Sequence, residues 1–86
     1  MKIKSGYILR KIAGQNTVVT VGKAADEFSG LIQLSESGAF VWNCLTEGLS
    51  EEELIRKLQE RYTDLDESTA KADLTAFIEK IRFALE

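Results

Sequence analysis

The first third of the chain carries short apolar runs typical of β-strands. The run Gly6–Ile12 is rich in aliphatic and aromatic residues, and Thr17–Val21 contains only β-branched residues. The residues between them, Gly14–Asn16, favour a turn. Together these features predict an antiparallel hairpin. Further along, Ala24–Phe28 predicts one turn of helix, and Leu31–Leu34 predicts a short third strand.

At Ser35 the apolar pattern changes from a strand period to a helix period. We expect Ser35 to cap the N-terminus of a first helix, and Gly48 to end it. One face of this helix carries Gly38, Val41, Trp42 and Leu45. Because these positions repeat at helical spacing, we expect that face to be buried.

A second helix is predicted to begin at Ser50. Ser50 and Glu53 have the spacing of a capping box, in which each side chain bonds the backbone N–H of the other residue. Residues 63–65 then form a short connector. The buried stripe predicted for this helix is Leu54, Ile55, Leu58 and Tyr62.

The third helix is predicted to span residues 66–85, with Asp66 as its N-cap. Its stripe of Ala70, Leu74, Phe77, Ile78, Ile81 and Leu85 covers about 100° of arc. The element order predicts an α+β fold: a three-stranded antiparallel sheet followed by three helices, like a winged helix-turn-helix. We expect residues 1–86 to form a single domain, because a chain this short supports one core.

Composition excludes several classes of function. The net charge of −3 argues against binding to nucleic acid or to an anionic membrane. There is no histidine and only one cysteine, Cys44, so we expect no zinc site, no other metal, no cofactor and no enzymatic activity. No apolar segment is long enough to span a membrane or to act as a signal peptide, which predicts a cytoplasmic protein.

From Leu31 onward the sequence resembles the PqqD family. Its strand, caps and helices share the family's order and spacing, in the segments Leu31–Leu34, Ser35–Ala39, Phe40–Trp42, Gly48–Leu54, Glu60–Tyr62 and Asp73–Ile81. The upstream segments Gly6–Arg10 and Val18–Gly22 also fit. Two positions depart from the pattern. Ser35 replaces the usual asparagine, and the tail Arg82–Glu86 lacks the usual glycine, which leaves the end of the last helix open.

The resemblance implies a recognition element with a fold similar to a winged helix-turn-helix. Such proteins hold the leader segment of a ribosomally made precursor peptide and deliver it to a modifying enzyme, often a radical S-adenosylmethionine enzyme. It also implies that the leader adds as a strand to the third strand and lies against the third helix. Pyrroloquinoline quinone synthesis is one of several pathways that such a protein serves.

A peptide that adds to a sheet needs an unpaired strand edge, and the third strand is the candidate. Along that strand, Ile32 and Leu34 point to one face, and Leu31 and Gln33 point to the other. On the last helix, a mixed apolar and cationic flank beside Leu74 is expected to form the second wall. The predicted peptide-binding residues are Leu31, Ile32, Gln33, Leu34, Lys71, Leu74, Thr75, Ile78 and Arg82. In this arrangement Lys71 or Arg82 would receive an acidic leader residue.

Three other functions are consistent with parts of the pattern. A DNA-binding winged helix would read bases with its last helix, but residues 66–86 hold five acidic and three basic residues. A small enzyme would need a nucleophile and base pair, which the sequence lacks. A homodimer would pair the same strand edge with a second copy of the chain.

Overall fold

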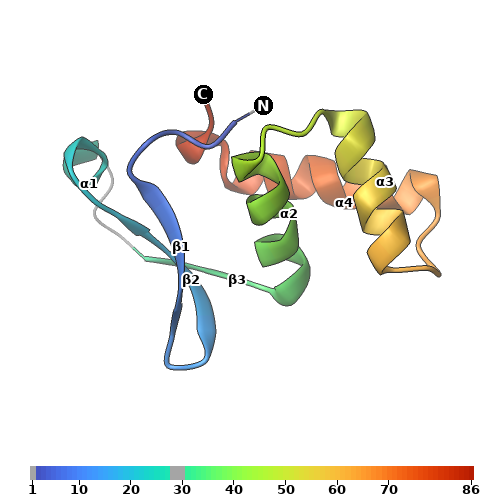
Figure 1. The fold of residues 1–86 in the computed structure, drawn as a ribbon, viewed down its shortest axis with the longest axis horizontal. Coiled ribbons are helices and arrows are strands. Elements are labelled where there is room, and N and C mark those ends of the chain that lie inside the picture. The colour runs from blue at the N-terminus through green and yellow to red at the C-terminus, as the bar shows by residue number, and fades with distance from the viewer. Residues whose placement is uncertain (1, 28–30) are drawn as a thin grey trace.

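The computed structural model describes residues 2–27 and 31–86. Figure 1 shows the β-sheet at one end of the molecule and helices α2, α3 and α4 at the other. The elements in chain order are β1 (Tyr7–Ile12), β2 (Gln15–Thr20), α1 (Lys23–Glu27), β3 (Ile32–Leu34), α2 (Glu36–Thr46), α3 (Glu51–Arg61), α4 (Glu67–Lys80) and the 3-10 helix η1 (Arg82–Ala84). This order confirms the predicted α+β fold, in which a three-stranded antiparallel sheet precedes the three main helices.

The β1–β2 hairpin turns at a different place from the one predicted. Its turn residues are Ala13 and Gly14, both with positive φ (52° and 80°). A two-residue turn with positive φ at both positions matches the right-handed twist of the strands. Gln15 and Asn16 were predicted to lie in the turn, but they belong to β2. Ala13 escaped prediction because alanine seldom adopts positive φ.

The sheet has the order β1-β2-β3, and both neighbouring pairs are antiparallel. Residues Leu9, Val18 and Ile32 face one another across the three strands. The side chains of these three residues lie on the sheet face that packs against the helices. Val18 and Leu34 are buried on that face. In the described part of the chain, β3 is bonded to β2 on one side and lies at the edge of the sheet on the other.

The hydrophobic core lies between this inner sheet face and the three helices. The predicted helix stripes are confirmed at their centres, since Val41, Leu45, Leu58 and Leu74 are buried. Burying each large aliphatic side chain stabilises the fold by about 1.5–3 kcal/mol. The largest side chains with almost no exposure are Trp42, Leu45, Leu54, Ile81 and Val18.

Each main helix begins with the cap that the sequence predicts. The Ser35 hydroxyl accepts a hydrogen bond from the Gly38 N–H at 3.2 Å. Ser50 and Glu53 form the complete capping box, with both hydrogen bonds present. Asp66 Oδ1 accepts a hydrogen bond from the Thr69 N–H at 2.7 Å. These caps satisfy N–H groups that have no partner within their own helix.

The cap of α4 predicts a dependence of stability on pH. Hydrogen bonding to the Thr69 N–H lowers the pKa of the Asp66 carboxyl below its ordinary value. A carboxyl with a lowered pKa in the folded state stabilises the fold at neutral pH, and that contribution is lost as pH falls through the lowered pKa. Asparagine also caps helices but does not titrate. We therefore expect the stability advantage of wild type over Asp66→Asn to shrink between about pH 7 and about pH 3, measured by urea unfolding. A constant difference across that range would contradict the expectation.

The last helix ends earlier than predicted. We expected it to run to residue 85, but α4 stops at Lys80, and Ile81 leaves helical geometry with φ −108° and ψ 16°. The chain then forms η1, and Leu85 makes an antiparallel bridge with Ile3. This bridge requires an extended backbone, so Leu85 cannot continue the helix.

The two ends of the chain form a clasp, which we define as residues 2–4 and 84–86. The Lys4 N–H donates to the Ala84 carbonyl at 2.7 Å, and the Glu86 N–H donates to the Lys2 carbonyl at 2.9 Å. Beside the clasp, the rings of Tyr7 and Phe83 meet edge to face with centroids 5.7 Å apart. Phe83, which lies off the predicted helix stripe, thus covers the start of β1.

The segment between β2 and β3 contains a short helix and an exposed leucine. The helical turn predicted at residues 24–28 is confirmed as α1, although Phe28 lies outside the described residues. Leu31 precedes β3 and is 69% exposed. None of the helices in the described residues has the length and apolar character required to cross a membrane.

Candidate functional site

The turn between β1 and β2 determines which way the backbone groups of β2 point. In a hairpin with a two-residue turn, the flanking residues form a hydrogen-bonded pair, here Ile12 and Gln15. Hydrogen-bonded and non-hydrogen-bonded pairs then alternate along the strands. The N–H and C=O groups of Thr17 therefore point to β1, whereas those of Asn16 and Val18 point to β3.

The same alternation fixes the free groups of β3. Leu34 faces Asn16 and Ile32 faces Val18, so these two β3 residues are directed to β2. Gln33 faces Thr17, whose backbone is already directed to β1. The N–H and C=O of Gln33 consequently point away from the sheet, where they can pair with an added strand.

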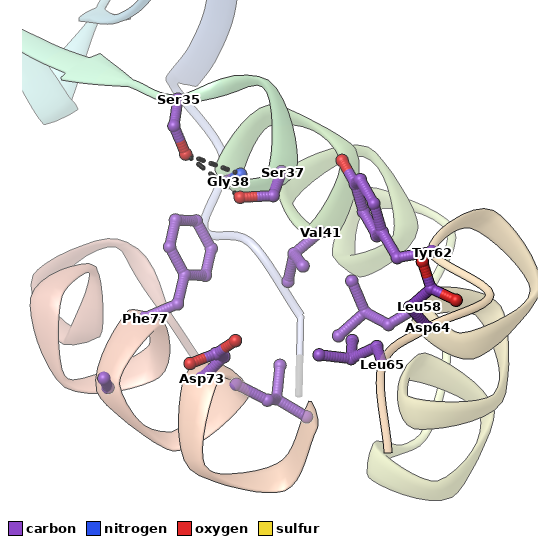
Figure 2. A pocket seen from close by; sticks show the side chains of 12 residues that line it. Ser35, Ser37, Gly38, Val41, Leu58, Tyr62, Asp64, Leu65, Asp73 and Phe77 are labelled. Carbon is purple, nitrogen blue, oxygen red and sulfur yellow. Dashed lines mark hydrogen bonds between the residues drawn. The ribbon is translucent and has the colours of Figure 1, made fainter. Parts of the chain in front are cut away.

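A pocket of about 690 Å³ begins at Ser35, the residue that directly follows β3. Figure 2 shows its side chains converging from the start of α2, the end of α3 and the middle of α4. Its apolar part comes mainly from Val41, Leu58, Leu74 and Phe77, and the polar atoms come from serine, tyrosine and aspartate. The lining residues are Ser35, Ser37, Gly38, Val41, Leu58, Tyr62, Asp64, Leu65, Asp73, Leu74, Ala76 and Phe77.

Gly38 lets α4 approach the start of α2 closely. A Cβ atom at this position would lie 3.0 Å from Cε1 of Phe77, closer than side-chain carbons normally approach. The same atom would lie 3.4 Å from the Ser35 hydroxyl and 3.5 Å from Cβ of Leu34. Gly38 is therefore the point where the end of β3, the cap of α2 and the Phe77 ring come together. The pocket, which Ser35, Gly38 and Phe77 line, thus lies directly beside the end of β3.

Arg61 positions one aromatic ring of the pocket. Its guanidinium lies 5.0 Å from the centre of the Phe40 ring and 5.8 Å from that of Tyr62. Such cation–π contacts contribute about 0.5–1 kcal/mol at exposed sites. Because Tyr62 ends α3 and lines the pocket, the contact helps to orient that wall.

Only part of the predicted residue set comes together at this pocket. Leu74 lines it, and Leu34 lies beside the lining residue Gly38. Ile32 and Gln33 lie on the adjoining strand. Lys71, however, lines a second pocket, on the side of α4 that meets the start of α3. Its role in peptide binding stays a prediction, and its position puts it on a different side of α4 from the pocket beside β3.

The other predicted positions on the last helix also lie away from the pocket. Thr75 is exposed and its hydroxyl donates to the Lys71 carbonyl at 2.9 Å, one turn back on the helix. Ile78 is half-buried against the core. Arg82 belongs to η1 and pairs with Glu79. Within the described residues, the flank of α4 that lines the pocket is therefore not the predicted one.

Three pocket residues of α4 were absent from the predicted site. Phe77 had been assigned wholly to the core, yet it is only half-buried. Asp73 and Ala76 lie on the flank opposite Lys71, and the sequence leaves the flank of Asp73, Lys80 and Ala84 open as a less well fitting second wall. The signal in the sequence was Gly38, since a small residue on a buried helix face marks a place where another element approaches closely.

Cys44 does not have the surroundings of a reactive cysteine. Cys44 is buried, and its burial, followed by the nearby Glu47 charge, raises the pKa of the thiol above its ordinary value. A raised pKa keeps a thiol protonated and weakly nucleophilic. In residues 2–27 and 31–86, no group of three potential ligands is arranged to hold a metal ion.

The family model for coenzyme PQQ synthesis protein D (PqqD) matches residues 25–83, about two thirds of the chain. The chain belongs to the PqqD family. The matched residues contain β3, the pocket and all three main helices, so the candidate site lies within the part that defines PqqD proteins. A search of curated protein sequences found no match.

A solved structure shares the fold of this PqqD-family protein. It is described as TbiB1 in complex with the TbiA(beta) leader peptide, and it matches with a TM-score of 0.79. The alignment covers 100% of this chain and 95% of TbiB1, at 23% sequence identity. At this identity the comparison shows a common fold, including the elements that form the strand edge and the pocket.

Proposed function

We propose that this protein binds the leader segment of a precursor peptide as an added strand on β3 and presents it to a modifying enzyme. The observation that carries the proposal is the continuity between the outward-pointing backbone of Gln33 and the pocket that begins at Ser35. Main-chain hydrogen bonds at a strand edge provide affinity for any extended peptide. The adjoining pocket provides selectivity through the side chains that it accepts.

The comparisons support this proposal. The chain belongs to the PqqD family, and a protein of the same fold, TbiB1, has been solved with a leader peptide bound. For the present chain we propose Leu31–Leu34 as the strand contact and Leu74 as part of the second wall. We add Phe77 and Asp73 to that wall because both line the pocket beside β3.

In this proposal the protein contributes binding and no chemistry of its own. A peptide fixed along β3 would have its modifiable residues outside the paired segment, where an enzyme can reach them. We propose a modifying enzyme as the second partner, with radical S-adenosylmethionine enzymes as the first class to test. The acidic charge of −3 gives no support to a nucleic-acid partner.

The proposal can be tested by NMR with a peptide selected for binding. Random peptides of about 12 residues displayed on phage would be selected on the immobilised protein, and a recovered sequence synthesised. We expect titration with this peptide to shift the backbone amides of Ile32, Gln33 and Leu34 and the side-chain signals of Phe77. Signals of α1 should stay unchanged and serve as the internal control.

Two results would count against the proposal. Shifts confined to the connector between α3 and α4, with β3 silent, would place the peptide elsewhere. A stable dimer in sedimentation experiments, with β3 protected from hydrogen exchange before any peptide is added, would mean that a second copy occupies the edge.

A further inference from the structure

The charged side chains that line the pocket beside β3 are all negative. Among its lining residues the charged side chains are Asp64 and Asp73, and no lysine or arginine lines it. Figure 2 shows the two carboxylates on different walls, with Asp73 on α4 beside Phe77 and Asp64 beside Leu65. Apolar side chains from α2, α3 and α4 lie between these walls. The pocket therefore combines an apolar interior with an anionic rim.

Neither carboxylate is neutralised within the part of the chain that the structure describes. Other acidic side chains do have partners there: Glu36 approaches Lys11, Glu79 pairs with Arg82, and Asp66 caps α4. Asp64 and Asp73 make no hydrogen bond or ion pair with a described residue. Two negative charges thus border a pocket that a peptide would enter, and no lysine or arginine of the described residues forms an ion pair with either.

We infer that the preferred leader carries an apolar side chain for this pocket and a lysine or arginine within two residues of it. This inference rests on the proposed function and specifies the peptide that the same site selects. Residues two apart in an extended peptide lie on one side, about 6.5–7 Å from each other. An apolar side chain in the pocket therefore keeps its basic neighbour near the rim that holds Asp64 and Asp73.

The direction of the added strand decides which part of the leader is read. The pocket lies at the C-terminal end of β3, because it begins at Ser35. A peptide antiparallel to β3 would place its residues upstream of the paired segment over the pocket. Lys71, which the sequence pairs with an acidic leader residue, lies at the second pocket and so takes no part in this contact.

The test compares phage selections of random peptides of about 12 residues on three proteins. These are the wild type, the double variant Asp64→Asn/Asp73→Asn, and the double variant Glu51→Gln/Glu52→Gln. The last variant changes the net charge equally but at the second pocket, so it controls for overall charge. We expect wild type and this control to enrich an apolar residue with lysine or arginine within two positions. The Asp64/Asp73 variant should lose the basic preference and keep the apolar one.

Affinities give the size of the effect. For one peptide selected on wild type, fluorescence anisotropy should show binding weakened about threefold to tenfold by the Asp64/Asp73 changes. The difference should shrink between about 0.05 M and about 0.5 M salt, because salt screens exposed charges. The same peptide with its basic residue changed to glutamine should bind both proteins equally.

The outcomes distinguish peptide binding at β3 from the preference for a basic residue beside the pocket. If wild type enriches no sequence, or if a selected peptide leaves the β3 amides unshifted in the NMR titration, peptide binding at β3 is wrong. If peptides bind at β3 but lack a basic residue, favour an acidic one, or bind the Asp64/Asp73 variant equally well, the charge preference is wrong and the proposed function stands.

Discussion

Replacing Trp42 with alanine is expected to lower the free energy of unfolding by about 3–5 kcal/mol. Trp42 is 1% exposed and lies in the core cluster with Val18 and Leu54. Alanine would remove most of that buried surface and leave a cavity that helices packed on a sheet cannot fully close. A domain of this size has a total stability of about 4–13 kcal/mol, so the loss would remove a large share of it.

Urea unfolding followed by far-UV circular dichroism would measure this loss, since the variant has no tryptophan fluorescence. Asn43→Ala is the matched control, because Asn43 is the next residue of α2 and is exposed. The control should change stability by less than about 0.5 kcal/mol. A loss below about 1 kcal/mol for Trp42→Ala would show that the core does not depend on this side chain.

Replacing Gln33 with proline is expected to weaken binding of a selected peptide by about tenfold or more. Proline removes the outward-pointing N–H, and its ring occupies the space next to the open edge. One net hydrogen bond is worth about 0.5–1.5 kcal/mol, and the ring adds a steric penalty to that loss. The fold should survive, because this N–H is not directed to β2.

Gln33→Ala is the matched control, since it keeps the backbone donor and shortens the same side chain. Isothermal titration calorimetry on the three proteins should give similar affinities for wild type and the alanine variant. Thermal unfolding would verify that the proline variant remains folded. Binding of the folded proline variant at wild-type strength would show that the peptide does not use the Gln33 N–H.

The parts of the fold that depend on neighbouring residues were predictable from sequence. Caps at Ser35, Ser50 and Asp66 depend on bonds that span three residues, so the pattern places helix starts correctly. The strands followed in the same way from short runs of aliphatic, aromatic and β-branched residues. The α+β order and the position of β3 needed no information from distant parts of the chain.

The end of α4 depended on a contact that no local pattern reveals. Ile81 and Leu85 continue the apolar period of the helix, and both pack against the core. Their burial comes from a different geometry, in which Leu85 pairs with Ile3 at the other end of the chain. Periodicity measures burial, and it cannot distinguish a helix from an extended segment that is buried for another reason.

The sequence and the structure favour different flanks of α4 for the second wall, because the rotation of α4 is hard to fix from sequence. Apolar residues Phe77 and Ile78 are adjacent in sequence and lie on the two margins of the buried stripe, so either flank was compatible with it. The close approach of Phe77 to Gly38 decides the matter, and it is a property of the packed structure. The rotation of α4 places Asp73 at the pocket beside β3 and Lys71 at the second pocket.

The clasp has a consequence for how this domain can be joined to other proteins. Its backbone hydrogen bonds bring both ends to one place, and Figure 1 shows them together at the upper edge, away from the β1–β2 turn at the lower edge. A domain with adjacent ends can be inserted into a loop of a host protein with little distortion. An enzyme fused at either end would start from the same point, and a linker of suitable length would give the held peptide a high effective concentration at the enzyme's active site.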